Sequence, residues 1–149
     1  MQALEKDAQY QEYSTKEKLL AFYYTLIEVL KSNRSFVMLC FEGVSKKDVS
    51  PPFMRDFKEV FGNYAKNLIE AGTVSNEIVD RPVIGKRYHE AMWIQMMFLI
   101  NFWSNDTSKQ FENTDAAIEK AVSLSFDLLG PGPLDSILDF TKFLYNHRK

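Results

Sequence analysis

Residues 81–103, RPVIGKRYHEAMWIQMMFLINFW, decide the fold of this chain. The segment opens with a proline and a basic, polar turn. Between Ala91 and Trp103 only Gln95 and Asn101 are polar. A helix that is apolar on nearly every side must be surrounded by protein or by lipid, and this run is shorter than the roughly 20 apolar residues that cross a bilayer. The segment therefore predicts the central helix of an all-α domain.

Helical periodicity also marks the segments that precede this run. Residues 14–17, STKE, match a capping box, and apolar side chains then recur at spacings of three and four as far as Leu30. A second amphipathic stripe follows two prolines and covers residues 53–69, and Gly72 is expected to end that helix. Residues 36–41, FVMLCF, predict a short helix, with Ser35 as its N-cap and Gly43 as its stop, because no other strand candidate exists to pair with them.

Two more helices are predicted toward the C-terminus. Asn113 is expected to cap a helix over residues 114–129. The sequence GPGP at residues 130–133 breaks the chain, and a last helix follows over residues 134–145. Its apolar side chains are expected to be buried: Leu134, Ile137, Leu138, Phe140, Thr141 and Leu144. The chain is thus predicted to form about six helices in a single domain spanning residues 1–149.

The composition bounds the class of function. The chain carries a net charge of −2 and has no basic stripe, so by itself it lacks the electrostatic footprint of a nucleic-acid binder. Its one cysteine, Cys40, excludes an internal disulfide and fits a reducing compartment. Residues 1–10 show no apolar signal region. These features predict a cytoplasmic protein that does not associate with membranes.

Catalytic and metal-binding signatures do not appear in the sequence. His89-Glu90 has no Glu-x-x-His partner motif, and the other histidine, His147, lies at the chain end. No glycine-rich phosphate loop and no G-x-S-x-G motif are present. Asp135 and Asp139 are spaced as a solvated helix face. We therefore expect neither an enzyme nor a bound cofactor or metal.

Two segments resemble the C-terminal regulatory domain of the TetR family of bacterial transcriptional repressors. They are STKEKLLAFYYTLIEVLKSNRSFV at residues 14–37 and GPGPLDSILDFTKFLYNHR at residues 130–148, and the order of the predicted helices agrees with that domain. The resemblance implies that residues 1–13 are the end of a connector helix from an N-terminal helix-turn-helix domain. Without such a domain the chain alone is not expected to bind operator DNA, and the choice between a fragment and a natural protein lacking it stays open.

The resemblance also implies a homodimer. The predicted helices 81–103 and 113–129 would pair with their counterparts in a second subunit as a four-helix bundle. The interface residues expected on this basis are Tyr88, Met92, Gln95, Met96, Trp103, Ile118, Ala121, Val122 and Ser125. The alternative is that the last helix covers both helices within one subunit.

A pocket for a small, apolar ligand is the second implication. The chain holds 12 Phe, 7 Tyr and 2 Trp, and large rings either fill a core or line an apolar cavity. The residues expected in the pocket are Phe22, Tyr23, Phe41, Phe57, Phe61, Tyr64, Trp93, Met97 and Phe98. We expect a ligand-sensing and dimerisation domain of a TetR-like repressor; the alternative is a stand-alone carrier of apolar ligands or lipids with no DNA role.

Overall fold

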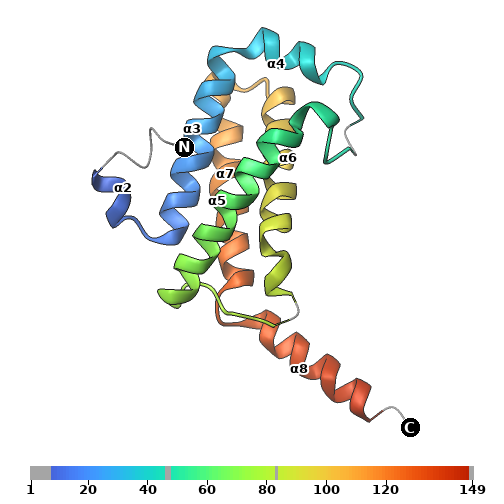
Figure 1. The fold of residues 1–149 in the computed structure, drawn as a ribbon. Coiled ribbons are helices and arrows are strands. Elements are labelled where there is room, and N and C mark those ends of the chain that lie inside the picture. The colour runs from blue at the N-terminus through green and yellow to red at the C-terminus, as the bar shows by residue number, and fades with distance from the viewer. Residues whose placement is uncertain (1–7, 46–47, 83, 148–149) are drawn as a thin grey trace.

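The computed structural model describes residues 8–45, 48–82 and 84–147, which form an all-α domain (Figure 1). Within these ranges lie seven α-helices, three 3-10 helices and no β-strand, which confirms the predicted fold class. The α-helices are α2 (Ala8–Glu12), α3 (Thr15–Ser32), α4 (Arg34–Phe41), α5 (Arg55–Val74), α6 (Tyr88–Asn105), α7 (Glu112–Leu129) and α8 (Pro133–Asn146). The 3-10 helices are η1 (Pro52–Met54), η2 (Gly85–Arg87) and η3 (Lys109–Phe111). Of the predicted connector segment, residues 1–7 lie outside the described residues.

Four helices form the body of the domain. α5 and α7 each pack against both α3 and α6. α4 lies across one end of this bundle, and α8 projects away from the other end (Figure 1). The core side chains of α6 are Tyr88, Met92, Trp93, Met96, Met97, Leu99, Ile100 and Trp103. The central role predicted for this helix is therefore confirmed, although one stripe along it stays exposed.

α6 begins later than the sequence predicts. The helix starts at Tyr88 rather than at Arg81, and the 3-10 helix η2 directly precedes it. The backbone N–H of Gly85, the first residue of η2, donates to the carbonyl of Arg81 at 2.7 Å and closes a turn there. Arg81 therefore precedes both η2 and α6, and its side chain is buried.

The predicted capping box at the start of α3 is confirmed. The backbone N–H of Glu17 donates to Ser14 Oγ at 3.2 Å, and the backbone N–H of Ser14 donates to Glu17 Oε2 at 2.8 Å. Glu77, from the segment after α5, accepts from the backbone N–H groups of Thr15 at 3.0 Å and Lys16 at 3.3 Å. Burial alone would raise the pKa of Glu77, but these hydrogen bonds outweigh it and lower the pKa. A long-range contact therefore completes a cap that is already visible in the sequence.

The short apolar segment is a helix, as predicted, but its cap differs. α4 begins at Arg34. Asn33 is both the C-cap of α3 and the N-cap of α4, so Ser35 is not the N-cap. Gly43 follows α4 with a φ of +78°, which is a left-handed conformation that glycine adopts readily. The predicted stop at Gly43 is confirmed.

Gly72 does not end its helix, because α5 continues to Val74. Gly72 is instead a point of close approach. A Cβ at this position would lie 2.7 Å from Ile78 Cδ1 and 3.0 Å from Thr15 Cγ2. The absence of a side chain lets the segment after α5 fold back against α3 and places Ile78 in the core.

Replacing Gly72 with alanine should destabilise the domain. Because the new methyl group would overlap the buried Ile78, we expect Gly72→Ala to lower the free energy of unfolding by about 1–3 kcal/mol. Gly62 lies in the same helix with nothing within 4 Å of an added Cβ, so Gly62→Ala should raise stability by about 0.5–1 kcal/mol. Urea unfolding monitored by circular dichroism measures both. Equal shifts of the same sign in the two variants would contradict the close packing at Gly72.

The prediction that Asn113 caps α7 is wrong. α7 begins at Glu112, two residues before the predicted start, and its first turn is capped by a side chain from the preceding loop. Asp106 Oδ2 accepts from the hydroxyl of Thr114 at 2.6 Å and from its backbone N–H at 2.9 Å. Asp106 Oδ1 accepts from the backbone N–H of Ser108 at 2.8 Å. The loop that looks polar and unstructured in the sequence is therefore anchored by a buried carboxylate.

Acid should loosen this anchor. The Thr114 and Ser108 hydrogen bonds lower the pKa of Asp106 to about 2 from an ordinary value of 3.8. A carboxyl group whose pKa is lower in the folded state stabilises the fold above pH 4, and this contribution is lost as the pH falls toward 2. We expect Asp106→Asn to reduce the melting temperature at pH 6 and to flatten its decline between pH 4 and pH 2. The control is Asp56→Asn, at an exposed carboxylate of α5; a pH profile of Asp106→Asn parallel to that of the wild type would contradict the anchor.

α8 departs most from the sequence-based expectation. The helix forms where predicted, and an N-terminal capping interaction from Asp135 to the Gly132 backbone N–H precedes it. Its apolar side chains, however, do not reach the core. The residues of α8 that were expected to be buried and are exposed are Ile137, Phe140, Thr141 and Leu144. The reason is that α8 touches its own subunit mainly through the end of α7 and then leaves the bundle (Figure 1).

Candidate ligand groove and subunit surface

A groove runs between α4 and α6. Its volume is about 600 Å³. Its walls are α4, the segment after α4 and the part of α6 from Ile94 to its C-terminal end. The apolar lining residues are Met38, Leu39, Phe41, Val44, Val49, Ile94, Met97, Phe98 and Ile100. The polar lining residues are Ser35, Glu42, Ser45, Asp48, Asn101, Ser104 and Asn105. This volume lies within the range of small-molecule sites, which are mostly apolar with a few polar groups.

Three of the nine residues predicted to bind a ligand line this groove, namely Phe41, Met97 and Phe98. Tyr64 lines a second, shallower hollow of about 360 Å³ between α2, α3 and α5. The sequence analysis did not predict the other apolar residues of this wall, since their spacing does not show that they lie over α6: Met38, Leu39, Val44 and Val49. The run of apolar residues in α4 was the available signal.

The other five predicted ligand residues belong to the packed core. Ring centroids lie 5.3 Å apart for Phe22 and Phe61, 6.0 Å for Phe61 and Trp93, and 6.3 Å for Phe57 and Trp93. Tyr23 is fully buried beside Phe22. In the structure these side chains interdigitate as core residues, and their contact with a ligand stays a prediction.

The aromatic core is joined to the groove at one point. Trp93 packs against Phe61 on its inner side. Its indole N–H donates to the carbonyl of Val49 at 2.7 Å, and Val49 is part of the groove wall. This bond holds the segment after α4 against α6, so the shape of the groove depends on a core residue.

Gln95 takes its partners within the subunit. Its Nε2 donates to the carbonyl of Ala121 at 2.7 Å and to Ser125 Oγ at 2.6 Å, and its Oε1 accepts from the Tyr23 hydroxyl at 3.0 Å. Burial raises the pKa of Tyr23, so this hydroxyl acts as a neutral donor. The amide therefore links α3, α6 and α7 within one chain. Asn101, by contrast, is exposed and lines the groove.

Most of the interface residues predicted on α6 and α7 face the core of their own subunit. Six of them are at most 6% exposed in the single subunit: Tyr88, Met92, Met96, Trp103, Ile118 and Val122. Side chains packed in their own core cannot contact a second subunit, so this assignment is corrected. Gln95, Ala121 and Ser125 lie at the margin of the buried face. The exposed apolar residues on these two helices are Ile94, Phe98, Leu124 and Leu128, and we call this set the α6–α7 outer surface.

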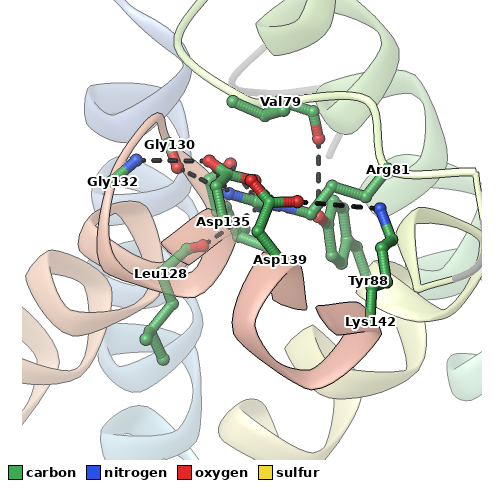
Figure 2. A network of polar contacts seen from close by, with 10 residues as sticks. Val79, Arg81, Tyr88, Leu128, Gly130, Gly132, Asp135, Asp139 and Lys142 are labelled. Carbon is green, nitrogen blue, oxygen red and sulfur yellow. Dashed lines mark hydrogen bonds and ion pairs between the residues drawn. The ribbon is translucent and has the colours of Figure 1, made fainter. Parts of the chain in front are cut away.

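Arg81 forms a polar hub where three segments meet. Figure 2 shows its guanidinium between the end of α7 and the start of α8. Arg81 Nε donates to Asp135 Oδ1 at 2.6 Å and Nη2 donates to Asp135 Oδ2 at 2.8 Å, a bidentate pair. Nη1 donates to the Tyr88 hydroxyl at 2.8 Å and to the carbonyl of Leu129 at 3.1 Å, and Nη2 also donates to the carbonyl of Gly130 at 2.9 Å.

These contacts fix the direction in which α8 leaves the bundle. Arg81 is 5% exposed, whereas the side chain of Asp135 is 41% exposed, so the pair lies at the protein edge. The Arg81 guanidinium lowers the pKa of Asp135, and the Asp135 carboxylate in turn raises the pKa of Arg81. Asp135 is thus not part of a solvated face, in contrast to Asp139, which is exposed and 3.8 Å from Lys142 Nζ. No sequence pattern predicts this hub, because half of the hydrogen bonds of Arg81 are made to backbone carbonyls.

Within the described ranges, no three His, Cys, Asp or Glu side chains are grouped so as to hold a metal ion. None of the described helices combines the length and apolarity that a bilayer crossing requires. Cys40 lies in α4 and is half-buried rather than part of the core.

These features define an all-α domain with a lateral apolar groove and a projecting C-terminal helix. A sequence model of the tetracyclin repressor-like, C-terminal domain family matches residues 18–144, from α3 almost to the end of α8, and the chain belongs to this family. No curated protein and no solved structure matches the chain. Domains of this family are regulatory, and they typically form dimers.

Proposed function

We propose that this chain is the ligand-sensing and dimerisation domain of a TetR-like transcriptional regulator, and that its effector is a small, largely apolar molecule bound in the groove between α4 and α6. The groove is the observation that carries the proposal. Its lining combines aliphatic, aromatic and methionine side chains with several polar groups. Methionine adapts its shape to irregular apolar ligands, and Met38 and Met97 lie on opposite walls.

The position of the groove suits a sensing role. Its wall residue Val49 is held by the hydrogen bond from Trp93, and Trp93 belongs to the aromatic core that reaches α3. A ligand that binds one arrangement of this wall better than another shifts the balance between the two arrangements. In the regulator we propose, such a shift alters the geometry of the dimer, and DNA is read by a separate helix-turn-helix domain.

Binding of a neutral fluorescent probe tests the groove. We expect N-phenyl-1-naphthylamine to bind the purified chain at one site per subunit. Leu39 is an exposed groove residue, so Leu39→Glu should weaken binding at least tenfold by placing a charge in the apolar wall. Val74→Glu, at an exposed position of α5 outside the groove, is the matched control. Absence of binding, or equal binding by the two variants, would overturn the groove as the ligand site.

Native mass spectrometry of the same samples reports the oligomer. A dimer that takes up one probe per subunit supports a sensing and dimerisation domain. A monomer that binds the probe instead supports the alternative of a stand-alone carrier for apolar ligands. A monomer that binds nothing would overturn both functions.

A further inference from the structure

Among the described helices, α8 carries the most exposed large apolar side chains. Five large side chains on this helix are between 52% and 79% exposed: Ile137, Phe140, Phe143, Leu144 and Tyr145. The charged residues Asp135, Asp139 and Lys142 share the opposite side, at spacings of three and four. An isolated helix of this length is marginal in water, and a contiguous apolar patch marks a surface that binds another molecule. The face of α8 therefore requires a cover.

The subunit's own bundle does not provide this cover. α8 leaves the end of α7 and points away from α3, α5 and α6 (Figure 1). The Arg81 hub holds that direction, because the bidentate pair with Asp135 and the bonds to the carbonyls of Leu129 and Gly130 tie α8 to the end of α7 (Figure 2). Folding α8 back onto its own chain would break a largely buried guanidinium network.

Each copy of the chain also carries a surface that can accept α8. The α6–α7 outer surface consists of Ile94, Phe98, Leu124 and Leu128, which are between 43% and 59% exposed. The two residues of each helix are four positions apart, so each pair lies on one side of its helix. α6 and α7 pack against each other. Two adjacent helices form a wide surface, and the apolar face of α8 is too broad for a single helix to cover.

The exposed area is sufficient for a dimer. A large side chain buries ~200 Å² when fully covered, so the nine exposed residues of the α8 face and the α6–α7 outer surface present roughly 1,000 Å² per subunit. Each partner in a standard protein interface buries about 800 Å². Because both surfaces occur on every copy, a two-fold axis lets two copies cover all of them in one step.

We propose that, in the dimer that the proposed function assumes, α8 of each subunit packs onto the α6–α7 outer surface of the other subunit. Ile94 and Phe98 belong to this surface and also line the groove. The partner's α8 therefore covers the open side of the groove next to these two residues. The ligand site is complete only in the dimer, and groove occupancy and subunit packing depend on the same side chains.

Cross-linking between two differently labelled copies tests the arrangement. Cys40 is the only cysteine, so Cys40→Ser gives a thiol-free background. One copy receives Leu124→Cys and the other Phe140→Cys, and the two are mixed and treated with a short bis-maleimide. We expect a covalent dimer of the unlike copies. A control mixture replaces Phe140→Cys by Val74→Cys, on exposed α5, and should remain uncross-linked. Equal cross-linking in the two mixtures would overturn the proposal.

Dimer dissociation provides a second measurement. Phe140→Glu should raise the dimer dissociation constant at least 100-fold in analytical ultracentrifugation and weaken probe binding, with the helix content unchanged because Phe140 is exposed. Val74→Glu should change neither. A wild-type dimer that Phe140→Glu leaves intact would overturn the α8 exchange and keep the proposed dimer. A monomeric wild-type protein would overturn both the α8 exchange and the proposed dimer. The Leu39→Glu experiment would still test whether that monomer binds the probe in the groove.

Discussion

Replacing Arg81 with alanine is expected to lower the free energy of unfolding by about 3 kcal/mol, which corresponds to a fall in melting temperature of roughly 6–12 °C for a domain of this size. The guanidinium is largely buried, and its removal leaves the Tyr88 hydroxyl and the carbonyls of Leu129 and Gly130 without that donor. The loss should stay at the low end for a buried ion pair, since Asp135 is partly exposed and can be solvated.

Two further substitutions separate geometry from charge. Arg81→Lys keeps the positive charge but cannot donate to the Asp135 carboxylate, the Tyr88 hydroxyl and three backbone carbonyls with the planar fork of a guanidinium. It should therefore recover less than half of the lost stability. Arg87→Ala, at an exposed position of η2, controls for the loss of a cation and should change stability by less than about 0.5 kcal/mol. Urea unfolding at pH 7 measures all three; equal midpoints for Arg81→Ala and Arg87→Ala would show that the hub has no structural role.

The positions of the helices could be predicted from the sequence, whereas long-range contacts such as those of Arg81 could not. Periodicity places α3, α5 and α7 within two residues of their observed bounds and finds α6 but not its start, because an amphipathic stripe survives any tertiary arrangement. The ends of these helices are less predictable. Gly72 reads as a helix stop and is a packing contact with Ile78, and Asn113 reads as a cap and is replaced by Asp106. Such contacts join residues from different segments, and helical periodicity within one segment does not predict them.

The faces of the helices present a different limit. Met96 and Trp103 are apolar residues of a helix expected to pair with a second subunit, yet both are fully buried in one chain. An apolar side chain lowers the free energy by leaving water in either setting, so residue type does not separate a core from an interface. On α8 the error is the opposite one, because residues predicted to be in the core lie on the surface. Ile137 and Phe140 read as core residues and are exposed.

The same limit applies to the predicted ligand residues, and Phe61 offers the sharpest test of it. In the structure Phe61 is fully buried between Phe22 and Trp93. Phe61→Ala should therefore lower the free energy of unfolding by about 3–5 kcal/mol, because it removes a buried ring and leaves a cavity. Thermal and urea unfolding measure this effect. If Phe61 instead lined an open ligand pocket, its truncation would cost little stability and would mainly weaken ligand binding.

Phe98 is the matched control, since it is the same residue type on the groove wall and is 52% exposed. Phe98→Ala should cost about 1 kcal/mol or less, because only part of the ring leaves an apolar environment. It should nevertheless weaken probe binding more than Phe61→Ala does, provided that binding is measured where both variants are folded. Phe61→Ala should thus have the larger effect on stability, and Phe98→Ala the larger effect on probe binding. A stability loss for Phe61→Ala no larger than that for Phe98→Ala would contradict the packed aromatic core and return Phe61 to the ligand site.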